Sequence, residues 1–413
     1  MPFEVPESWE WCKLIDVCHI FGRIGFRGYT KDDLVANDGA ITLSPSNIIE
    51  GQMNYDNCTY ISWDKYEESP EIQIANGDIL LVKTGSSFGK CAYVCNLPQE
   101  ATINPQFVVL KYILCNPRFL TYILQSGYAR RNYDEFVLGT AIPTFTQIVL
   151  GGMYIPLPSI QEQQRIVNAI EQWSALIDTL ETTKENLQTS ITQTKSKILD
   201  LAIHGRLVPQ DPNDEPAIEL LKRINPSFTP CDNAHYENVP SNWAVCKVKD
   251  AFMINPKTKA DDDMEAGFVP MSNIQDSYKN KFSFEPRTWG NIKKGYTHFE
   301  NGDIVVAKIS PCLENRKSSV MIGLPNGIGA GTTELNVFRS DYVHPLYGLF
   351  FFKSDYFISQ CVGTFNGVVG QQRVSTKIIE DIAFPVPPRS EQERIIKKVS
   401  KLFQILDCIS AEL

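Results

Sequence analysis

The sequence contains few of the patterns with which enzymes bind phosphate or activate a nucleophile. GSSFGKC at residues 85–91 comes nearest to a phosphate-binding loop. It has three rather than four residues between its glycines, however, and Cys91 stands where that loop carries Ser or Thr. The acidic run at residues 261–263 lacks a spaced partner that would complete a metal site. Neither a GxSxG nor an HExxH motif occurs.

Two further patterns are incomplete. INPQF at residues 103–107 is similar to the Asn-Pro-Pro-aromatic motif of amino-methyltransferases, but Gln106 takes the place of the second proline. The eleven Cys include no CxxC pair and the five His are scattered, so metal-ligand spacing is missing. Reduced thiols in a cytoplasmic protein are the simplest interpretation. We therefore expect no catalysis by this chain alone, and a binding or scaffolding role instead.

Length and charge narrow the binding classes. A chain of 413 residues has room for two or three domains, each with its own core. No basic segment followed by an apolar run opens the sequence, and no eighteen apolar residues follow one another, so neither an export signal nor a membrane span is expected. The net charge of −9 argues against coating nucleic acid through bulk positive charge. Any DNA binding must rest on local sites or on a partner.

An internal repeat organises the chain. Residues 5–18, 76–85 and 155–167 return as residues 239–252, 301–310 and 384–396. The three offsets are 234, 225 and 229 residues, so one unit of about 229 residues occurs twice, with small insertions and deletions. Within each unit, short β-type runs alternate with Gly, Pro, Asn and Asp clusters, which predicts a mixed, strand-rich domain. The predicted strands are residues 79–82, 107–113, 304–307 and 334–338.

Each unit ends in a helical pattern with apolar residues at alternating steps of four and three. Ser159 and Glu162 have capping-box spacing before the first helix, and Gly205 with Pro209 stops it. We predict that the two helices pair antiparallel as a coiled coil; the alternative for the longer one is a member of a core bundle. The predicted seam is Ile166, Ile170, Trp173, Ile177, Leu180, Leu187, Ile191, Ile198, Leu201, Ile395, Val399, Leu402, Leu406 and Ile409.

This organisation resembles the DNA-specificity subunit of a type I restriction-modification system. Residues 197–224, KILDLAIHGRLVPQDPNDEPAIELLKRI, are similar to the central conserved region of that family, and its PxPPxxEQxRI motif occurs as IPLPSIQEQQRI and FPVPPRSEQERI. The resemblance covers essentially the whole chain. It implies an α+β chain of two target recognition domains at residues 1–158 and 209–388, each reading half of a split site in double-stranded DNA, with conserved helices at residues 159–208 and 389–413 related by a pseudo-twofold axis.

The resemblance also implies partners. Two methyltransferase subunits would dock on the coiled coil and restriction subunits would bind that assembly, with S-adenosylmethionine, ATP and Mg on those partners and no cofactor or metal on this chain. A cytoplasmic location follows. Two alternatives stay open: the specificity part of a type II-like fused or associated enzyme, and a coiled-coil interaction scaffold that reads no DNA.

Base readout needs donors and acceptors at groove edges, with Lys and Arg fixing the phosphate register. Polar loops that occur in corresponding places of both units supply such side chains. For each residue, the alternative is an ordinary polar surface loop. The candidates are Arg27, Ser46, Asn47, Lys83, Thr84, Ser86, Ser87, Lys90 and Thr144 in the first unit, and Lys257, Ser272, Asn273, Lys308, Ser310, Arg316, Lys317, Gln371, Gln372 and Arg373 in the second.

Overall fold

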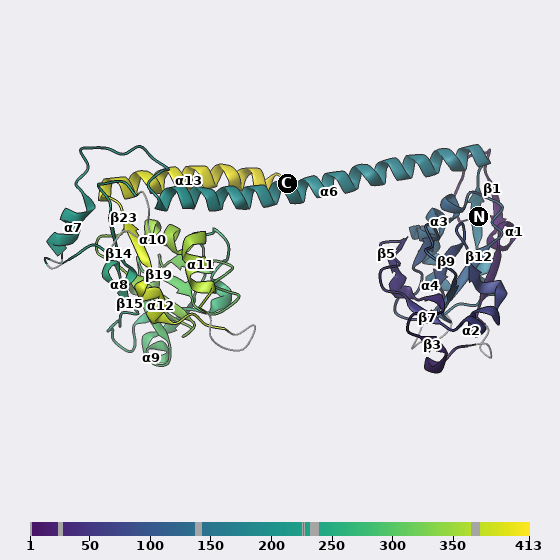
Figure 1. The fold of residues 1–413 in the computed structure, drawn as a ribbon, viewed down its shortest axis with the longest axis horizontal. Coiled ribbons are helices and arrows are strands. Elements are labelled where there is room, and N and C mark those ends of the chain that lie inside the picture. Colours follow the sequence, from purple (N-terminus) through teal and green to yellow (C-terminus); the bar gives the residue numbers. More distant parts are fainter. Residues whose placement is uncertain are drawn as a thin grey trace. The chain divides into compact units, whose positions relative to one another are not determined.

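The computed structural model describes residues 2–23, 28–136, 143–224, 226, 228–231, 239–364 and 372–413. The chain divides into two compact units, Met1–Leu180 and Glu181–Leu413, which are described separately (Figure 1). Each unit contains a globular mixed α/β part and a stretch of long helix. Within the described residues, no helix is both long and apolar enough to cross a membrane.

The first unit has two main sheets and a two-stranded ribbon. The first sheet has the order β2 (His19–Gly22), β12 (Phe107–Lys111), β9 (Ile79–Val82), β10 (Cys91–Tyr93), β6 (Gln52–Met53) and β5 (Ile48–Ile49). The second has the order β3 (Leu34–Val35), β7 (Thr59–Ile61), β4 (Ala40–Leu43), β11 (Ala101–Ile103) and β8 (Gln73–Ile74). The ribbon pairs β1 (Glu10–Lys13) with β13 (Tyr154–Leu157).

Five short helices complete the globular part of the first unit: α1 (Leu14–Val17), α2 (Trp63–Glu67), α3 (Pro117–Gln125), α4 (Gly127–Glu135) and α5 (Gln147–Gly151). The four residues of strand β9 are all apolar because both faces of the strand are covered. Ile79 and Leu81 pack into the core under α3 and α4, whereas Leu80 and Val82 pack into the core between the two sheets. A strand covered on both faces loses the usual alternation of polar and apolar residues.

The second unit repeats this arrangement. One sheet has the order β15 (Met253–Ile254), β22 (Leu335–Arg339), β19 (Ile304–Ala307) and β20 (Ser318–Val320). The other has the order β17 (Glu285–Thr288), β16 (Glu265–Val269), β21 (Ile328–Gly331) and β18 (Thr297–Glu300), and β14 (Ala244–Lys247) pairs with β23 (Ala383–Val386). The short helices are α7 (Ala217–Ile224), α8 (Val248–Ala251), α9 (Trp289–Ile292), α10 (Pro345–Phe352), α11 (Asp355–Val362) and α12 (Thr376–Asp381).

Strand order and direction agree between the two units. The order β2-β12-β9-β10 matches β15-β22-β19-β20, all antiparallel. In the other sheet of each unit, one parallel pair, β4 with β11 or β16 with β21, lies between antiparallel neighbours. The predicted strands are present, with small differences in their ends: β12 stops at Lys111, and β22 runs Leu335–Arg339.

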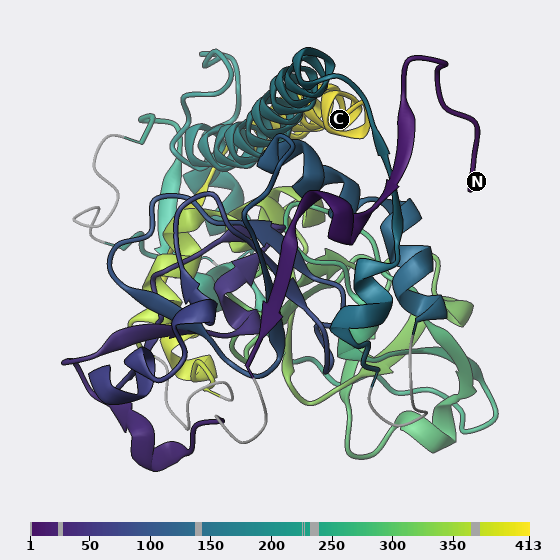
Figure 2. The same cartoon turned by 90° about the vertical axis from the view of Figure 1, so that its right-hand side faces the viewer.

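Two long helices have the predicted positions. Helix α6 is Ile160–Ile203 and α13 is Arg389–Ala411. Within the second unit, α13 lies along the later part of α6 in both views (Figures 1 and 2). The pair is antiparallel, because Lys195 forms an ion pair with Asp407 and Ser410 Oγ donates to Gln188 Oε1 at 2.8 Å.

The predicted seam residues differ in their environment. Ile191, Ile198, Ile395 and Val399 are buried, and Leu201, Leu402 and Leu406 are half-buried. Ile166 and Ile170, near the start of α6, are also half-buried. The exposed members are Trp173, Ile177, Leu180, Leu187 and Ile409.

Candidate nucleic-acid interface

Three loops of the first unit are joined into one surface. They are residues 83–90 after β9, residues 104–106 before β12, and residues 143–147 before α5; we call them the first three-loop rim. Lys83 N donates to Gln106 O at 2.8 Å, and Phe145 N donates to Lys83 O at 3.2 Å. Thr84 and Thr144 form a β-bridge. Segments about twenty to sixty residues apart in the sequence are thereby held edge to edge.

The second unit builds the same frame from residues 308–317, 332–334 and 372–376, the second three-loop rim. Lys308 N donates to Glu334 O at 2.9 Å, and Val374 N donates to Lys308 O at 3.0 Å. Ile309 and Arg373 form the bridge that corresponds to Thr84 and Thr144. The backbone frame is therefore repeated although the side chains differ.

Glycine is required at one position of the first rim. Gly85 has a φ of +99°, and a Cβ atom there would lie 2.9 Å from Gln106 Nε2. The positive φ favours glycine here, because other residues are strained in that conformation. The backbone N–H of Gly85 donates to Pro143 O at 3.3 Å, which fastens the third loop.

Lys83 is the cation at the centre of the first rim. It is half-buried, and burial lowers the pKa of its ammonium group. Lys83 Nζ and Gln147 Nε2 both lie over Gly22, where a Cβ atom would be 3.5 Å and 2.5 Å from them. Thr84 and Thr144 are half-buried and Ser86 is exposed. This surface offers the half-buried Lys83, the exposed Lys90 and several hydrogen-bonding groups, which suits contact with phosphate and base edges.

Lys317 and Arg373 of the second rim are held by hydrogen bonds within the protein. Arg373 binds Glu334 with both arms of its guanidinium, at 2.8–3.1 Å. Those hydrogen bonds hold the pKa of Glu334 below its usual value and the pKa of Arg373 above its own. Lys317 Nζ donates to Met271 O at 3.2 Å, and Ser310 Oγ donates to Glu314. A phosphate must therefore compete with these intramolecular partners.

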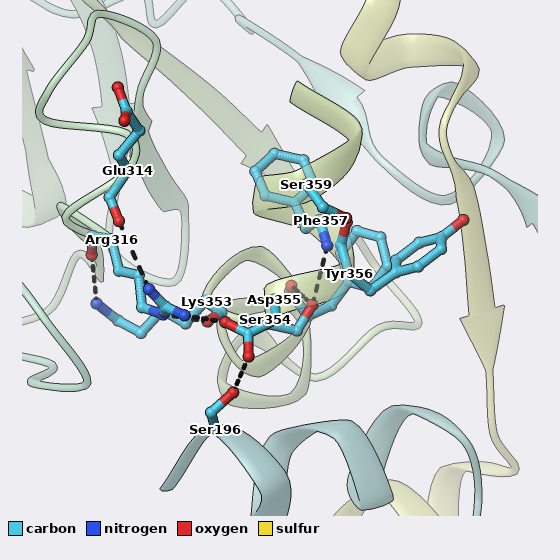
Figure 3. Close-up of polar contacts among 10 residues, drawn as sticks. Ser196, Glu314, Arg316, Lys353, Ser354, Asp355, Tyr356, Phe357 and Ser359 are labelled. Atoms are coloured by element: carbon cyan, nitrogen blue, oxygen red, sulfur yellow. Dashed lines mark hydrogen bonds and ion pairs between the residues drawn. The ribbon is translucent and has the colours of Figure 1, made fainter. Parts of the chain in front are cut away.

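Arg316 points toward Lys353 and Asp355, as Figure 3 shows. Its guanidinium pairs with Asp355 and stacks over Tyr278, with 5.0 Å from Cζ to the ring centre. Asp355 also accepts a hydrogen bond from Ser196 of α6. Arg316 therefore joins its loop to α11 and α6, and in this arrangement it is engaged within the protein rather than available to DNA.

Lys353 lies beneath that ion pair and is 1% exposed. Its Nζ donates to Ser277 O at 2.9 Å and to Arg316 O at 2.7 Å, and Arg316 Nε donates back to Lys353 O at 2.9 Å. Burial is the main reason that the pKa of Lys353 falls to about 7. The Lys353 side chain thereby connects the loops that contain Ser277 and Arg316 to the corner between α10 and α11.

The remaining candidates lie outside the two rims or at their edges. Asn47 is buried, and its amide closes the turn around it: Oδ1 accepts from Ser44 N at 2.9 Å and Nδ2 donates to Asn54 O at 3.1 Å. Asn273 is half-buried, and Gln372 is half-buried within the second rim. Arg27 and Gln371 fall outside the described residues. The exposed candidates are Ser46, Lys90, Lys257 and Ser272, and Ser87 and Lys308 are half-buried.

Sequence reasoning missed the middle loop of each rim. Gln106 and Glu334 stand at corresponding places in the two frames, because their backbone O atoms accept from Lys83 N and Lys308 N respectively. The available signal was the INPQF segment, which we compared only with a methyltransferase motif. Asn104 and Gln106 in fact hydrogen-bond each other, with Asn104 Nδ2 to Gln106 Oε1 at 3.0 Å.

The chemistry of the described residues is that of binding. No group of three or more His, Cys, Asp or Glu within them could hold a metal ion. The cysteines are free thiols, and burial raises the pKa of Cys18 to about 12 and that of Cys115 to about 11, so these thiols stay protonated at neutral pH. Hydrogen bonds and ion pairs at the two rims are what the site can supply.

Comparison with known proteins identifies the same organisation. The family model "Type I restriction modification DNA specificity domain" matches residues 6–189 and 240–413. The chain is 38% identical over 269 residues to the EcoAI specificity subunit and 40% identical over 237 residues to the EcoEI specificity subunit, both type I restriction enzymes of Escherichia coli. These matches cover 59% and 52% of this chain, but only 46% and 40% of the relatives, so the chain spans less than half of their length.

Solved structures agree in fold. The HsdS subunit from Thermoanaerobacter tengcongensis superposes with a TM-score of 0.57 at 16% identity, covering 100% of this chain and 93% of that one. A chain from a type I restriction-modification assembly gives a TM-score of 0.60 at 15% identity, covering 100% and 94%. Because the family model matches both repeated units, this chain belongs to the type I restriction-modification DNA specificity family.

Proposed function

We propose that this chain is the DNA-recognition subunit of a type I restriction-modification system, and that each three-loop rim reads one half of a bipartite target. The observation that carries the proposal is the repeated frame: three loops joined by the same backbone hydrogen bonds occur once in each unit. A frame that occurs twice supports two readers of similar geometry.

The side chains on the two frames support two different half-sites. The first rim contains Gln106 and Thr144, whereas the second has Glu334 and Arg373 in the corresponding loops, joined as an ion pair. An amide and a hydroxyl offer neutral donors and acceptors, whereas the ion pair offers a guanidinium whose position is set by a carboxylate. We therefore expect an asymmetric target, with different bases on either side of an unread gap.

The partners follow from the family. Its curated relatives are named specificity subunits of restriction enzymes, and we propose that this chain likewise assembles with methyltransferase and restriction subunits. S-adenosylmethionine, ATP and Mg would bind those partners, and this chain would position them on DNA without performing the chemistry. The α6–α13 pair would extend into a coiled coil, and the two units would be related by a pseudo-twofold axis.

The decisive experiment is co-expression of the chain with the methyltransferase subunit encoded beside it, followed by sequencing of the modified bases. The expected result is one methylated motif in two parts, separated by a constant gap. Exchange of residues 308–317 for a different loop should change only one part of the motif. An unmodified genome would overturn the proposal, and methylation by the purified chain alone would favour a fused enzyme.

A further inference from the structure

Lys83 and Gln147 bring two hydrogen-bond donors to one point of the first three-loop rim. Lys83 directly follows β9, and Gln147 is the first residue of α5. A Cβ atom on Gly22 of β2 would lie 3.5 Å from Lys83 Nζ and 2.5 Å from Gln147 Nε2, so both nitrogens lie within 3.5 Å of that point. Among the described residues, neither nitrogen has a hydrogen-bond or ion-pair partner. Two adjacent donors at the rim are therefore free to bind a ligand.

The Lys83 ammonium group is partly removed from water without a counter-charge. Burial lowers its pKa, and no carboxylate among the described residues opposes that effect. A cation in this position loses hydration and gains nothing in return until an acceptor reaches it. The half-buried stem also restricts where the ammonium group can go. A ligand with acceptor atoms would thus be bound at a defined place.

The corresponding lysine of the second rim has different neighbours. Lys308 follows β19 as Lys83 follows β9, but the residue whose carbonyl accepts from its backbone N–H is Glu334 rather than Gln106. Hydrogen bonds from Arg373 and, to a smaller extent, the charge of Lys308 lower the pKa of Glu334. Lys308 therefore has an anion of the protein nearby, whereas no described carboxylate acts on Lys83 in this way.

The counterpart of Gln147 is engaged within the protein. Thr376 follows the bridged residue Arg373 at the same distance as Gln147 follows Thr144. Thr376 Oγ1 donates to Asn336 Oδ1 at 3.1 Å, and Asn336 is 0% exposed. The hydroxyl group is thus directed into the protein. Within the described parts of the two rims, only the first presents this pair of unpartnered donors.

Guanine is the base whose edge fits two donors. In the major groove it presents two acceptors, N7 and O6, side by side. Adenine combines one acceptor with a donor, cytosine presents a donor, and thymine presents one acceptor beside a methyl group. Two donors, one of them charged, therefore favour guanine over the other three bases. Phosphate oxygens also accept hydrogen bonds, but the exposed Lys90 of the same loop is better placed to follow the DNA backbone.

We propose that Lys83 and Gln147 are specificity-determining residues that read one guanine in the half-site addressed by the first unit, by donating to its O6 and N7. The inference rests on the proposed function, because it takes the first rim as a reader of DNA. Gly22 would form the floor of the site, since a side chain there would displace the Gln147 amide. Lys90 would contact phosphate.

Base analogues test the contact in the complex of the full chain with its methyltransferase subunit. The half of the methylated motif that persists when residues 308–317 are exchanged is the half to probe. Each guanine of that half is replaced in turn by its 7-deaza analogue, which lacks N7. Fluorescence anisotropy should show binding weakened about tenfold at one position. Replacing the same guanine by hypoxanthine, which keeps O6 and N7, should change the affinity less than about twofold.

Substitutions assign the effect to this site. Lys83→Met keeps the length of the side chain without its charge, and it should bind the guanine and 7-deaza duplexes with equal affinity. Gly22→Ala keeps both donors but pushes the Gln147 amide aside, and it should reduce the same preference. Its Cβ atom would lie 3.4 Å from Val108 Cγ1, an ordinary contact, so folding should be unchanged. Lys90→Met, the matched control, should keep the preference while lowering the slope of log K against log[salt] by about 0.9.

The outcomes separate this inference from the proposed function. A bipartite methylated motif in which no guanine of this half is sensitive to the loss of N7 would overturn the inference alone. So would a Lys83→Met complex that keeps the preference for guanine and loses only salt dependence, as Lys90→Met should, because Lys83 would then contact phosphate. Absence of any methylated motif would contradict the proposed function as well.

Discussion

Gln125 and Lys353 occupy corresponding places in the two units and make the same kind of contact with different chemistry. Gln125 Nε2 donates to Gly51 O and Cys91 O, both at 2.9 Å, and Lys353 Nζ donates to Ser277 O and Arg316 O. Both side chains close the α3–α4 or α10–α11 corner onto two loops. The position demands a donor to two carbonyl groups, and it does not demand a charge.

The surroundings of the two corners differ in their exposure to water, which matters for the charge of Lys353. Gln125 is exposed and lines a cleft of about 730 Å³ beside α6, opposite Ser174. In the second unit the residue in register with Ser174 is Phe403, which packs against Tyr278 with 5.7 Å between ring centres. That packing closes the space over Lys353. The same local sequence position is thus solvated in one unit and dry in the other.

The largest expected effect tests whether Lys353 can be replaced by the residue used in the first unit. Its pKa of about 7 lies below the usual 10.5, so between these values the unfolded chain binds more protons than the folded chain. The free energy of unfolding of the second unit should therefore rise with pH, by about 2 kcal/mol from pH 7 to 9. Lys353→Gln should remove this rise in urea unfolding, and Lys377→Gln, at an exposed lysine, should keep it. Equal slopes in all three proteins would contradict the assignment.

Trp9 and Trp243 correspond in the internal repeat, but the same substitution to Phe should affect stability unequally at the two positions. Trp243→Phe removes a donor from the buried Glu391 and should lower the free energy of unfolding of its unit by about 2 kcal/mol. Trp9→Phe removes an N–H that has no partner among the described residues, so its cost should stay below about 0.5 kcal/mol. Denaturant unfolding of both variants measures the contrast. Equal losses would mean that Trp9 has an acceptor in solution.

The paired glutamines predict equal effects. Gln163 Oε1 accepts from Asn116 N and Gln392 Oε1 accepts from His344 N, both at 2.7 Å, so each glutamine fastens a long helix to the N-cap residue of a shorter one. Gln163→Ala and Gln392→Ala should each cost about 1 kcal/mol, because a backbone N–H is left without its acceptor. Hydrogen exchange at the backbone amides of Asn116 and His344 measures separately how well each of these hydrogen bonds is protected. A large difference between the two losses of stability would show that corresponding positions of the repeat do not contribute equally to stability.

The smallest expected effect concerns the rims. Glu334→Gln gives the second rim the residue type of Gln106 and removes the carboxylate that holds Arg373. DNA binding by the assembled complex should strengthen a few-fold, and log K against log[salt] should steepen by about 0.9 for one added phosphate contact. Gln106→Glu is the reciprocal variant and should weaken binding. Unchanged salt dependence in Glu334→Gln would place Arg373 away from the DNA backbone.

Much of the architecture could be predicted because its signals are local. The repeated segments, the β-type runs at residues 79–82 and 304–307, and the heptad spacing of both long helices are each visible within a few turns of chain. The helix pairing within the second unit also followed, since two apolar stripes of equal period cover each other most readily antiparallel when a domain joins them.

The loops that meet at each rim were only partly predictable. Residues 83–90 and 144 were named together, but Gln106 and Glu334 were missed because a loop with ordinary composition carries no mark of its tertiary neighbours. Nor did any pattern in the sequence indicate that Arg316 and Arg373 have carboxylate partners within the protein.

The sequence by itself determined a duplicated mixed α/β unit, its two heptad helices and the absence of familiar catalytic motifs, since each depends on periodicity or on residue types at fixed spacing. Only the tertiary structure decided which cations have partners within the protein, which hydrogen-bond donors are shielded from water and which apolar residues remain exposed. Those properties depend on groups brought together from distant parts of the chain, as Lys353 with Ser277 and Arg316 shows. Burial and electrostatic partners are set by packing, and identical residues in two repeats can therefore meet different conditions.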